Sequence, residues 1–182
     1  LAGNRLTLEP TESAIIQDPL RAGKGTLYEG GVRVPLIVAW PGKVQPDTRS
    51  SEVVCSIDFY PTLLDLLDLP KKEGVKFDGV SLAAVLRDPS ARLDREAVFN
   101  FFPHGGPSKP PGVTVRQGDW KLIRWFETGP EYPSIHELYN LKDDLGEMRN
   151  LAAEQPGQVK RLDALIDRFL ADTQALVPKR KS

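Results

Sequence analysis

One lysine, Lys24, stands between two glycines at the start of residues 23–35, which read Gly-Lys-Gly-Thr-Leu-Tyr-Glu-Gly-Gly-Val-Arg-Val-Pro. Because glycines carry no side chain, the backbone beside the lysine can approach a ligand closely. A fixed ammonium group stabilises negative charge that develops during a reaction, above all where water is excluded. The stretch therefore predicts an anion-binding loop in which Lys24 is the contact residue. The alternative is a solvated loop lysine.

Two other charged residues lie in the same stretch. Glu29 is expected to hold the loop, by pairing with Arg33 or by positioning Lys24. The guanidinium of Arg33 has a planar fork that suits the oxygens of an oxyanion. A structural ion pair accounts for Arg33 equally well.

Few further residues suggest chemistry, since the chain has two histidines and one cysteine. His104 precedes a Gly/Pro-rich loop, so it is either a donor to a substrate oxygen or an exposed loop residue. His136 is expected at the surface. Cys55 has no basic neighbour and is expected to be a small buried residue rather than a nucleophile. Asp58 is expected to cap a helix rather than bind a metal, no pair of histidines has metal-ligand spacing, and no His-Cys cluster occurs.

The composition bounds the class of protein. The chain has 182 residues, of which 40% are hydrophobic, so it can form a core. Its 24 basic and 25 acidic residues nearly cancel, which gives no support for a nucleic-acid or membrane-surface partner. No apolar stretch is long enough to span a bilayer. A signal-peptide pattern is missing, but this does not indicate a cytoplasmic protein.

The first half of the chain predicts elements that carry the lysine loop. Residues 34–40 form a continuous apolar run that ends in a Pro-Gly turn, which predicts a buried strand. A helix is expected after it, with Pro61 in the first turn. Its leucines Leu63, Leu66 and Leu67 recur at helical spacing and are expected to face the core.

The second half changes pattern. Strand-forming residues separated by turn signals predict four consecutive strands, at 97–102, 112–116, 120–126 and 137–140. Consecutive strands joined by short turns favour an antiparallel sheet. A helix is expected from Pro156, with apolar residues at helical spacing and charges of both signs between them. This mixture favours a helix packed on the sheet over a membrane or calmodulin-binding helix.

The stretch around Lys24 resembles the sulfatase family, in which Gly-Lys-Gly-Thr-x-Tyr-Glu-Gly-Gly-x-Arg-x-Pro is followed by Trp-Pro-Gly. The resemblance continues along nearly the whole chain. Its further motifs are Asp-x-x-Pro-Thr-Leu-Leu at 58–64, Asp-Gly-x-Ser-Leu at 78–82, Gly-Asp-Trp-Lys-Leu at 118–122 and Glu-Leu-Tyr-Asn-Leu at 137–141.

This resemblance implies the C-terminal portion of a sulfatase with an α/β, alkaline-phosphatase-like fold. Residues 1–92 would end the large α/β domain, and residues 93–182 would form a small C-terminal domain of an antiparallel sheet packed by a long C-terminal helix. The implied reaction is hydrolysis of a sulfate monoester. Lys24 would be the catalytic residue that contacts the sulfate group, and His104 would line the substrate pocket.

The resemblance also implies calcium and a formylglycine nucleophile, whose residues this chain lacks. Cys55 does not lie in the required Cys/Ser-x-Pro/Ala-x-Arg motif, and the family's metal-binding Asp-Asn-Gly does not occur. We therefore expect no metal ligands in these 182 residues and no activity from them alone. The expected partners are a sulfated small molecule or glycan and the rest of the same sulfatase chain. The expected location is periplasmic, secreted or lysosomal.

Two alternatives stay open at this point. One is a phosphate ester or phosphonate hydrolase of the same superfamily. The other is a non-catalytic binding module derived from a sulfatase.

Overall fold

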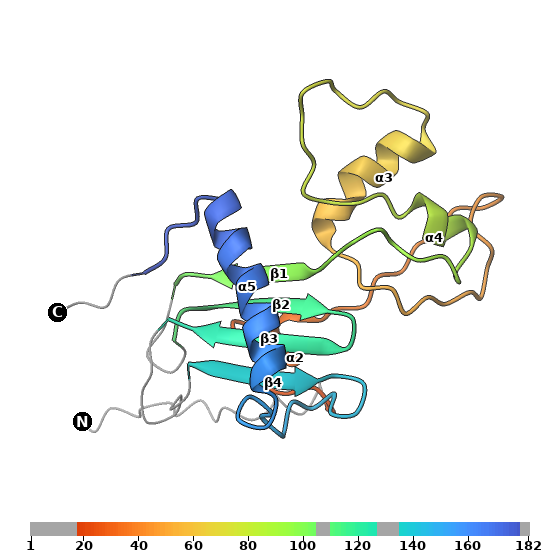
Figure 1. Ribbon diagram of the computed structural model, residues 1–182. Coiled ribbons are helices and arrows are strands. Elements are labelled where there is room, and N and C mark those ends of the chain that lie inside the picture. Colours follow the sequence, from red (N-terminus) through yellow and green to blue (C-terminus); the bar gives the residue numbers. More distant parts are fainter. Residues whose placement is uncertain (1–17, 105–109, 127–134, 179–182) are drawn as a thin grey trace, which may run out of the picture. The chain divides into compact units, whose positions relative to one another are not determined.

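The computed structural model describes residues 18–104, 110–126 and 135–178. These residues group into two compact units (Figure 1). Residues Pro35–Val98 form the helical unit, and the described residues up to Val34 and from Phe99 onward form the sheet unit. These units describe packing within this chain. The predicted domain boundary between residues 92 and 93 stays a prediction.

Four strands form the sheet in the order β1-β2-β3-β4, with neighbouring strands antiparallel (Figure 1). Their bounds are β1 Val98–Phe102, β2 Gly112–Gln117, β3 Trp120–Trp125 and β4 His136–Asn140. Gly118 has φ 59 in the turn between β2 and β3, a left-handed conformation that favours glycine. The antiparallel sheet predicted from the sequence is confirmed.

Both faces of this sheet are covered, and side-chain alternation sorts the residues between them. Helix α5 (Pro156–Asp172) crosses one face (Figure 1), with Leu162 and Ile166 fully buried. The segment that leads into the short helix α2 (Glu29–Val32) packs on the other face. Its apolar residues Leu27 and Tyr28 form a core cluster with Ile123 of β3. The predicted packing of the C-terminal helix on the sheet is confirmed, with Pro156 in the first turn.

The helical unit holds the 3-10 turn η1 (Ser56–Asp58), helix α3 (Phe59–Leu66) and helix α4 (Ala83–Arg87). The expectation that Leu63, Leu66 and Leu67 face the core is wrong for two of them, since Leu63 and Leu67 are 51% and 54% exposed, whereas Leu66 is half-buried. Leu64 is buried instead, at 8% exposure. Helical spacing identifies an apolar stripe, but only packing decides which side of a helix is covered within one chain.

The predicted buried strand at 34–40 is also wrong for this chain. The structure assigns no strand there, and Val34 and Ile37 are 80% and 89% exposed. A buried strand needs neighbours on both edges and both faces, and the described residues do not supply them. Val34, Leu36, Ile37 and Val38 of the apolar run are therefore exposed, and Trp40 at its end is half-buried.

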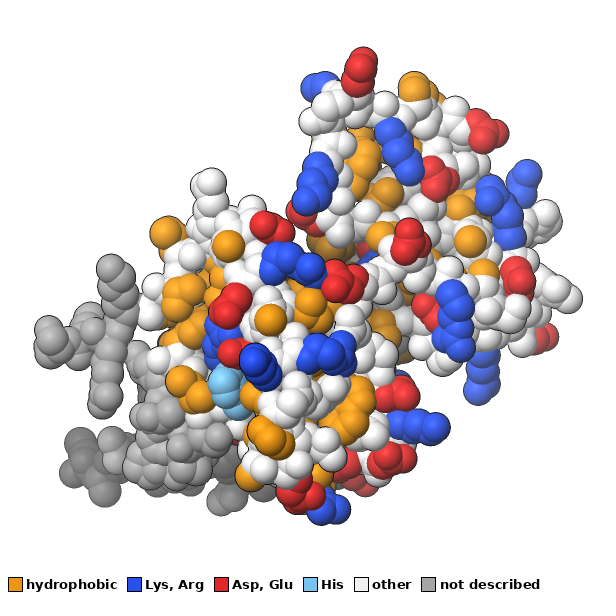
Figure 2. Space-filling view, in the orientation of Figure 1, with side chains coloured by type: hydrophobic (Ala, Val, Ile, Leu, Met, Phe, Trp, Pro, Cys, Tyr) orange, Lys and Arg blue, Asp and Glu red, His pale blue; other side chains and the backbone are white. Residues whose placement is uncertain are grey.

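The visible surface mixes charges of both signs, and Figure 2 shows basic and acidic side chains interspersed over both units. No helix in the described part of the chain is long and apolar enough to cross a membrane.

Candidate anion-binding site

The lysine loop, residues 21–31, turns back on itself and carries Lys24 near its tip. Thr26 closes the turn, because its N–H and its hydroxyl both donate to the carbonyl oxygen three residues earlier, at 3.2 and 2.8 Å. The N–H of Gly30 donates to the carbonyl oxygen of Arg21 at 3.0 Å and closes the base of the loop. Lys24 itself is exposed. Lys24 is therefore an exposed residue on a loop whose base is closed by hydrogen bonds.

Two glycines allow the limbs of the loop to approach each other. A Cβ on Gly30 would lie 2.4 Å from the carbonyl oxygens of both Arg21 and Ala22. A Cβ on Gly31 would lie 2.3 Å from the carbonyl oxygen of Thr26. Both distances are too short for any real Cβ, so the loop shape requires glycine at these two positions.

Apolar side chains bury the second limb of the loop in the core of the sheet unit. Leu27 and Tyr28 are 3% and 5% exposed. The ring of Tyr28 meets that of Trp125 edge-on, with centroids 6.0 Å apart. Burying a large apolar side chain contributes about 1.5–3 kcal/mol, so these two residues alone hold the limb firmly.

Glu29 continues this limb and is 2% exposed. Its carboxylate accepts a hydrogen bond from the Nζ of Lys121 at 2.9 Å. Its N–H donates to the Oε2 of Glu147 at 2.6 Å. Arg116 and Arg33 lie farther from the carboxylate, at 3.5 and 3.9 Å. Glu29 therefore holds the loop, as expected, but its main partner is Lys121 of β3 rather than Arg33.

Lys121 also approaches the second carboxylate of this cluster. Its Nζ lies 2.8 Å from the Oε1 of Glu147, whose residue is completely buried. Burial raises the pKa of Glu147, and the nearby Lys121 opposes that rise. One ammonium group thus faces two carboxylates in the interior of the sheet unit.

Arg21 fixes the first limb of the loop. Its guanidinium carbon lies 3.9 Å from the centroid of the Tyr28 ring. Its Nη1 donates to the hydroxyl of Tyr139 at 2.9 Å and to the carbonyl oxygen of Glu147 at 2.8 Å. Both limbs are therefore attached to β4 and to the turn that follows it.

Glu137 of β4 collects further donors below the loop. It accepts the hydroxyl of Tyr28 at 2.9 Å, the hydroxyl of Tyr139 at 2.6 Å and the indole N–H of Trp125 at 3.0 Å. A buried carboxylate with several donors is well satisfied. These three hydrogen bonds fix the aromatic side chains that pack beneath the loop.

Sequence reasoning missed the partners Lys121, Glu147 and Glu137. Strand alternation does carry one signal, because Lys121 shares a sheet face with Ile123 and Trp125. A lysine on an inward face implies a buried acidic partner, but the strand pattern alone does not identify which acid it meets.

The two histidines have different surroundings. His104 follows β1 and is exposed, and the adjoining residues 105–109 lie outside the described residues. Its role in a substrate pocket stays a prediction, like the sulfate contact of Lys24. His136 was expected at the surface, but it is half-buried, with its Nε2 2.9 Å from the Oδ1 of Asp163. Together with Arg124, it ties α5 to the sheet.

Asp58 has a structural role in the helical unit. Its buried carboxylate accepts the N–H of Cys55 at 2.7 Å and of Val80 at 3.0 Å, and it pairs with Arg95. It therefore caps the η1 turn rather than α3 directly. Cys55 is half-buried, not buried as expected. Within the described residues, no group of three His, Cys, Asp or Glu side chains could hold a metal ion.

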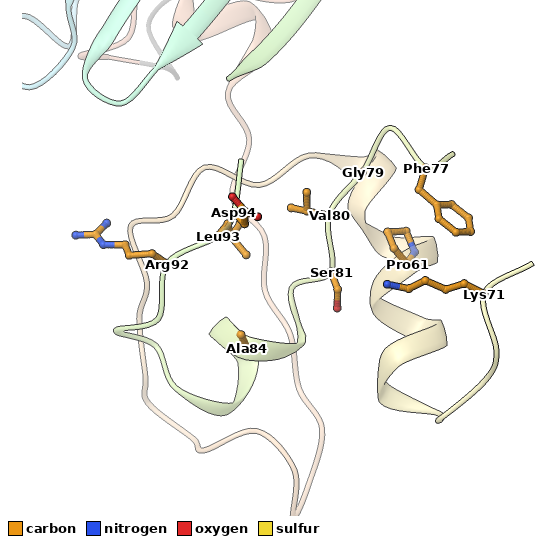
Figure 3. Close-up of a pocket in the computed structure, with 10 residues that line it drawn as sticks. All are labelled: Pro61, Lys71, Phe77, Gly79, Val80, Ser81, Ala84, Arg92, Leu93 and Asp94. Atoms are coloured by element: carbon orange, nitrogen blue, oxygen red, sulfur yellow. The ribbon is translucent and has the colours of Figure 1, made fainter. Parts of the chain in front are cut away.

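A cavity of about 490 Å³ lies within the helical unit (Figure 3). Its two cations already have acidic partners. Lys71 lies 3.4 Å from Asp65, and Arg92 lies 2.6 Å from Glu52. Figure 3 shows the side chain of Arg92 extending away from the other lining residues. The cavity therefore lacks the converging donors that an anion site needs.

The chain is similar in sequence to known sulfatases. Residues 22–175 match the family model described as N-sulphoglucosamine sulphohydrolase, C-terminal. The chain is 43% identical over 152 residues to a sulfatase of Formosa agariphila, covering 77% of this chain and 26% of that protein. It is 35% identical over 150 residues to human arylsulfatase A, covering 72% of this chain and 28% of that protein.

Solved structures agree as well. A structure reported for the metabolism of multiple glycosaminoglycans by Bacteroides thetaiotaomicron superposes with a TM-score of 0.64 at 26% identity. The match covers 82% of this chain and 31% of the other chain. The crystal structure of Ps i-CgsB has a TM-score of 0.70 at 23% identity, covers 84% and 32% of the two chains, and supports the fold alone.

The lysine loop and the four-stranded sheet with its C-terminal helix thus define the C-terminal portion of a sulfatase. The chain belongs to the family N-sulphoglucosamine sulphohydrolase, C-terminal. The resemblance and the alkaline-phosphatase-like fold class expected from the sequence are confirmed. The chain spans roughly a quarter of the length of the two sulfatases compared above, 26% and 28%.

Proposed function

We propose that this chain is the C-terminal part of an enzyme that hydrolyses sulfate monoesters, and that Lys24 contacts the sulfate group. The observation that supports this role is the loop itself, because both its limbs are fixed in the sheet unit while Lys24 is exposed near its tip. A lysine whose backbone is fixed by its scaffold stabilises transition-state charge with less reorganisation than a lysine on a loose loop.

The chemistry explains why a lysine suits this position. Attack on sulfur, followed by departure of the alcohol, concentrates negative charge on the sulfuryl oxygens. Removing one fixed electrostatic donor from such a site costs about 10²–10³-fold in kcat. In our proposal, the formylglycine nucleophile and the calcium ion that the family resemblance implies are held by residues outside this chain. His104 would contribute to the substrate pocket.

The proposed main partner is the remainder of the same sulfatase chain. Two uncovered apolar surfaces support this. Val34 and Ile37 are exposed in the run at 34–40, and Leu63 and Leu67 are exposed on α3 and at its C-terminal end. Large exposed apolar surfaces mark interaction sites in soluble proteins. The compared sulfatases are several times longer than this chain, so they contain enough additional residues to cover both surfaces.

The proposed substrate is a sulfated small molecule or glycan. Support for a sulfated sugar comes from the neighbour reported for glycosaminoglycan metabolism, which is 26% identical to this chain. A periplasmic, secreted or lysosomal location is proposed on the family resemblance.

Substitution of Lys24 tests the assignment in the full-length protein. We expect Lys24→Ala to lower kcat/KM for a fluorogenic aryl sulfate about 100-fold or more, with little change in melting temperature. Lys160→Ala removes an exposed lysine of α5 and is the matched control. Wild-type activity in the Lys24 variant would show that this residue does not contact the sulfate.

Two further measurements separate the alternatives. Paired aryl sulfate and aryl phosphate assays of the full-length protein distinguish a sulfatase from a phosphate ester hydrolase. The 182-residue chain alone is expected to turn over neither substrate. Detectable aryl sulfate turnover by the isolated chain would show that its own residues supply the nucleophile. Absence of a formylglycine motif from the full-length sequence would favour the non-catalytic module.

A further inference from the structure

A single residue, Glu147, contacts both ends of the lysine loop. Its backbone carbonyl accepts a hydrogen bond from the Nη1 of Arg21 at 2.8 Å. Its carboxylate accepts the N–H of Glu29 at 2.6 Å. These two partners lie on either side of Lys24, at opposite ends of the loop. One residue of the sheet unit therefore fixes the spacing between the two ends of the loop.

The side chain that performs this role is itself fixed. Glu147 is completely buried, and the Nζ of Lys121 lies 2.8 Å from its other carboxylate oxygen, Oε1. The same Nζ donates to the carboxylate of Glu29 at 2.9 Å. Lys121 is 1% exposed and extends from the middle of the sheet. The backbone and side chain of Glu29 are thus both held by a closed triangle of Glu29, Lys121 and Glu147.

Stability alone does not account for this triangle. Buried ion pairs are weak evidence for stability, because desolvation of the charges offsets their attraction, and apolar residues of similar volume often serve as well. What directional contacts do provide is geometry, since a displacement of about 1 Å in a positioned group can cost about 100-fold in rate. A loop that must place one ammonium group is a site where such geometry matters.

We propose that Glu147, with Lys121, is a positioning clamp that sets the placement of Lys24 for the bound sulfate. The inference rests on the sulfate contact proposed above. Neither residue need touch the substrate, so both act through Lys24. The clamp links the small sheet to catalysis, which gives the C-terminal part of the chain a direct influence on the rate.

A double-mutant cycle in the full-length protein tests the clamp. Glu147→Gln keeps the shape of the side chain but removes its charge beside Lys121. If the clamp acts through Lys24, this substitution lowers kcat/KM for an aryl sulfate about 10-fold or more in the wild-type background. In the Lys24→Ala background, where there is no ammonium group to place, the further loss stays below about 2-fold.

The matched control is Glu154→Gln, which makes the same chemical change in the exposed ion pair between Glu154 and Arg149. It should alter kcat/KM by less than about 2-fold in either background. An equal loss from Glu147→Gln in both backgrounds would overturn the clamp, as would a loss below 2-fold in the wild-type background. Glu147→Asp keeps the charge but has a side chain shorter by one methylene. This variant is tested in the same double-mutant cycle if the glutamine variant does not fold.

Hydrogen exchange separates failure of the clamp from failure of the proposed function. If the full-length protein lacks sulfatase activity, or if Lys24→Ala is fully active, the proposed function is wrong. The clamp still predicts that Glu147→Gln accelerates exchange of the Glu29 and Gly30 amides at least 10-fold over the Glu154→Gln control. Unchanged exchange at both amides would overturn the clamp independently of any activity.

Discussion

Tyr139 carries two hydrogen bonds whose loss can be predicted quantitatively. Its hydroxyl donates to the Oε2 of Glu137 at 2.6 Å and accepts from the Nη1 of Arg21 at 2.9 Å. Burial raises the pKa of Tyr139, so the hydroxyl remains protonated and able to donate. A hydrogen bond to a charged group contributes about 1.5–3 kcal/mol. Because Arg21 keeps its bond to the carbonyl of Glu147, we expect Tyr139→Phe to cost roughly 3 kcal/mol rather than the full sum for two bonds.

The effect should appear where the limbs of the lysine loop meet. The N–H of Gly30 closes the loop on Arg21, so its exchange with solvent reports local opening. Each 1.4 kcal/mol corresponds to a factor of ten, so Tyr139→Phe should accelerate this exchange about 100-fold. Tyr28→Phe removes the hydrogen bond that Tyr28 donates to Glu137 and should also accelerate this exchange, by at least about 10-fold.

The control for both variants is Tyr60→Phe, which removes a hydroxyl from a tyrosine that is 60% exposed in the helical unit. Its effect on Gly30 exchange should fall within about 2-fold of wild type. The reasoning is refuted if Tyr139→Phe and Tyr60→Phe give the same exchange rate.

Two further predictions concern the same unit. Gly31→Ala should destabilise the loop by about 1–3 kcal/mol, since its Cβ would meet the carbonyl of Thr26, whereas a Cβ on Gly23 has nothing within 4 Å and Gly23→Ala should leave stability nearly unchanged. Equal melting temperatures for the two variants would contradict this. Burial raises the pKa of Glu147 above its usual 4.5, so the folded state binds that proton more tightly than the unfolded state. Wild-type stability should therefore fall as pH rises from about 4.5 through the raised pKa, and Glu147→Gln should flatten that part of a thermal-unfolding profile. Parallel profiles for the two proteins would contradict the assignment.

The strands of the small sheet and the C-terminal helix were predictable because their signals are local. Alternation, turn residues and helical spacing are all read within a few neighbours, and Pro156 marks the first turn of the helix. The run at 34–40 has an equally clear local signal, yet it is not a strand in this chain. A strand is completed by partners that are distant in sequence, and apolar character alone does not supply them.

Lys24 could be proposed as a contact residue from the sequence because the glycines beside it and the motif around it are contiguous. The anchoring of its loop could not. Lys121 and Glu147 lie 92 and 118 residues from Glu29, and no local pattern connects them. Leu63 and Leu67 show the same limit, since their spacing defines a stripe but not what covers it.

The sequence by itself determined the family, the residue that offers a positive charge, and the elements of the small sheet, because each is carried by neighbouring residues. Only the tertiary structure decided that Lys24 belongs to a loop held at both ends by Glu147, and that Lys121 pairs with the carboxylates of Glu29 and Glu147. The physical reason is that burying charge requires partners at hydrogen-bond distance, and folding brings those partners together from distant parts of the chain.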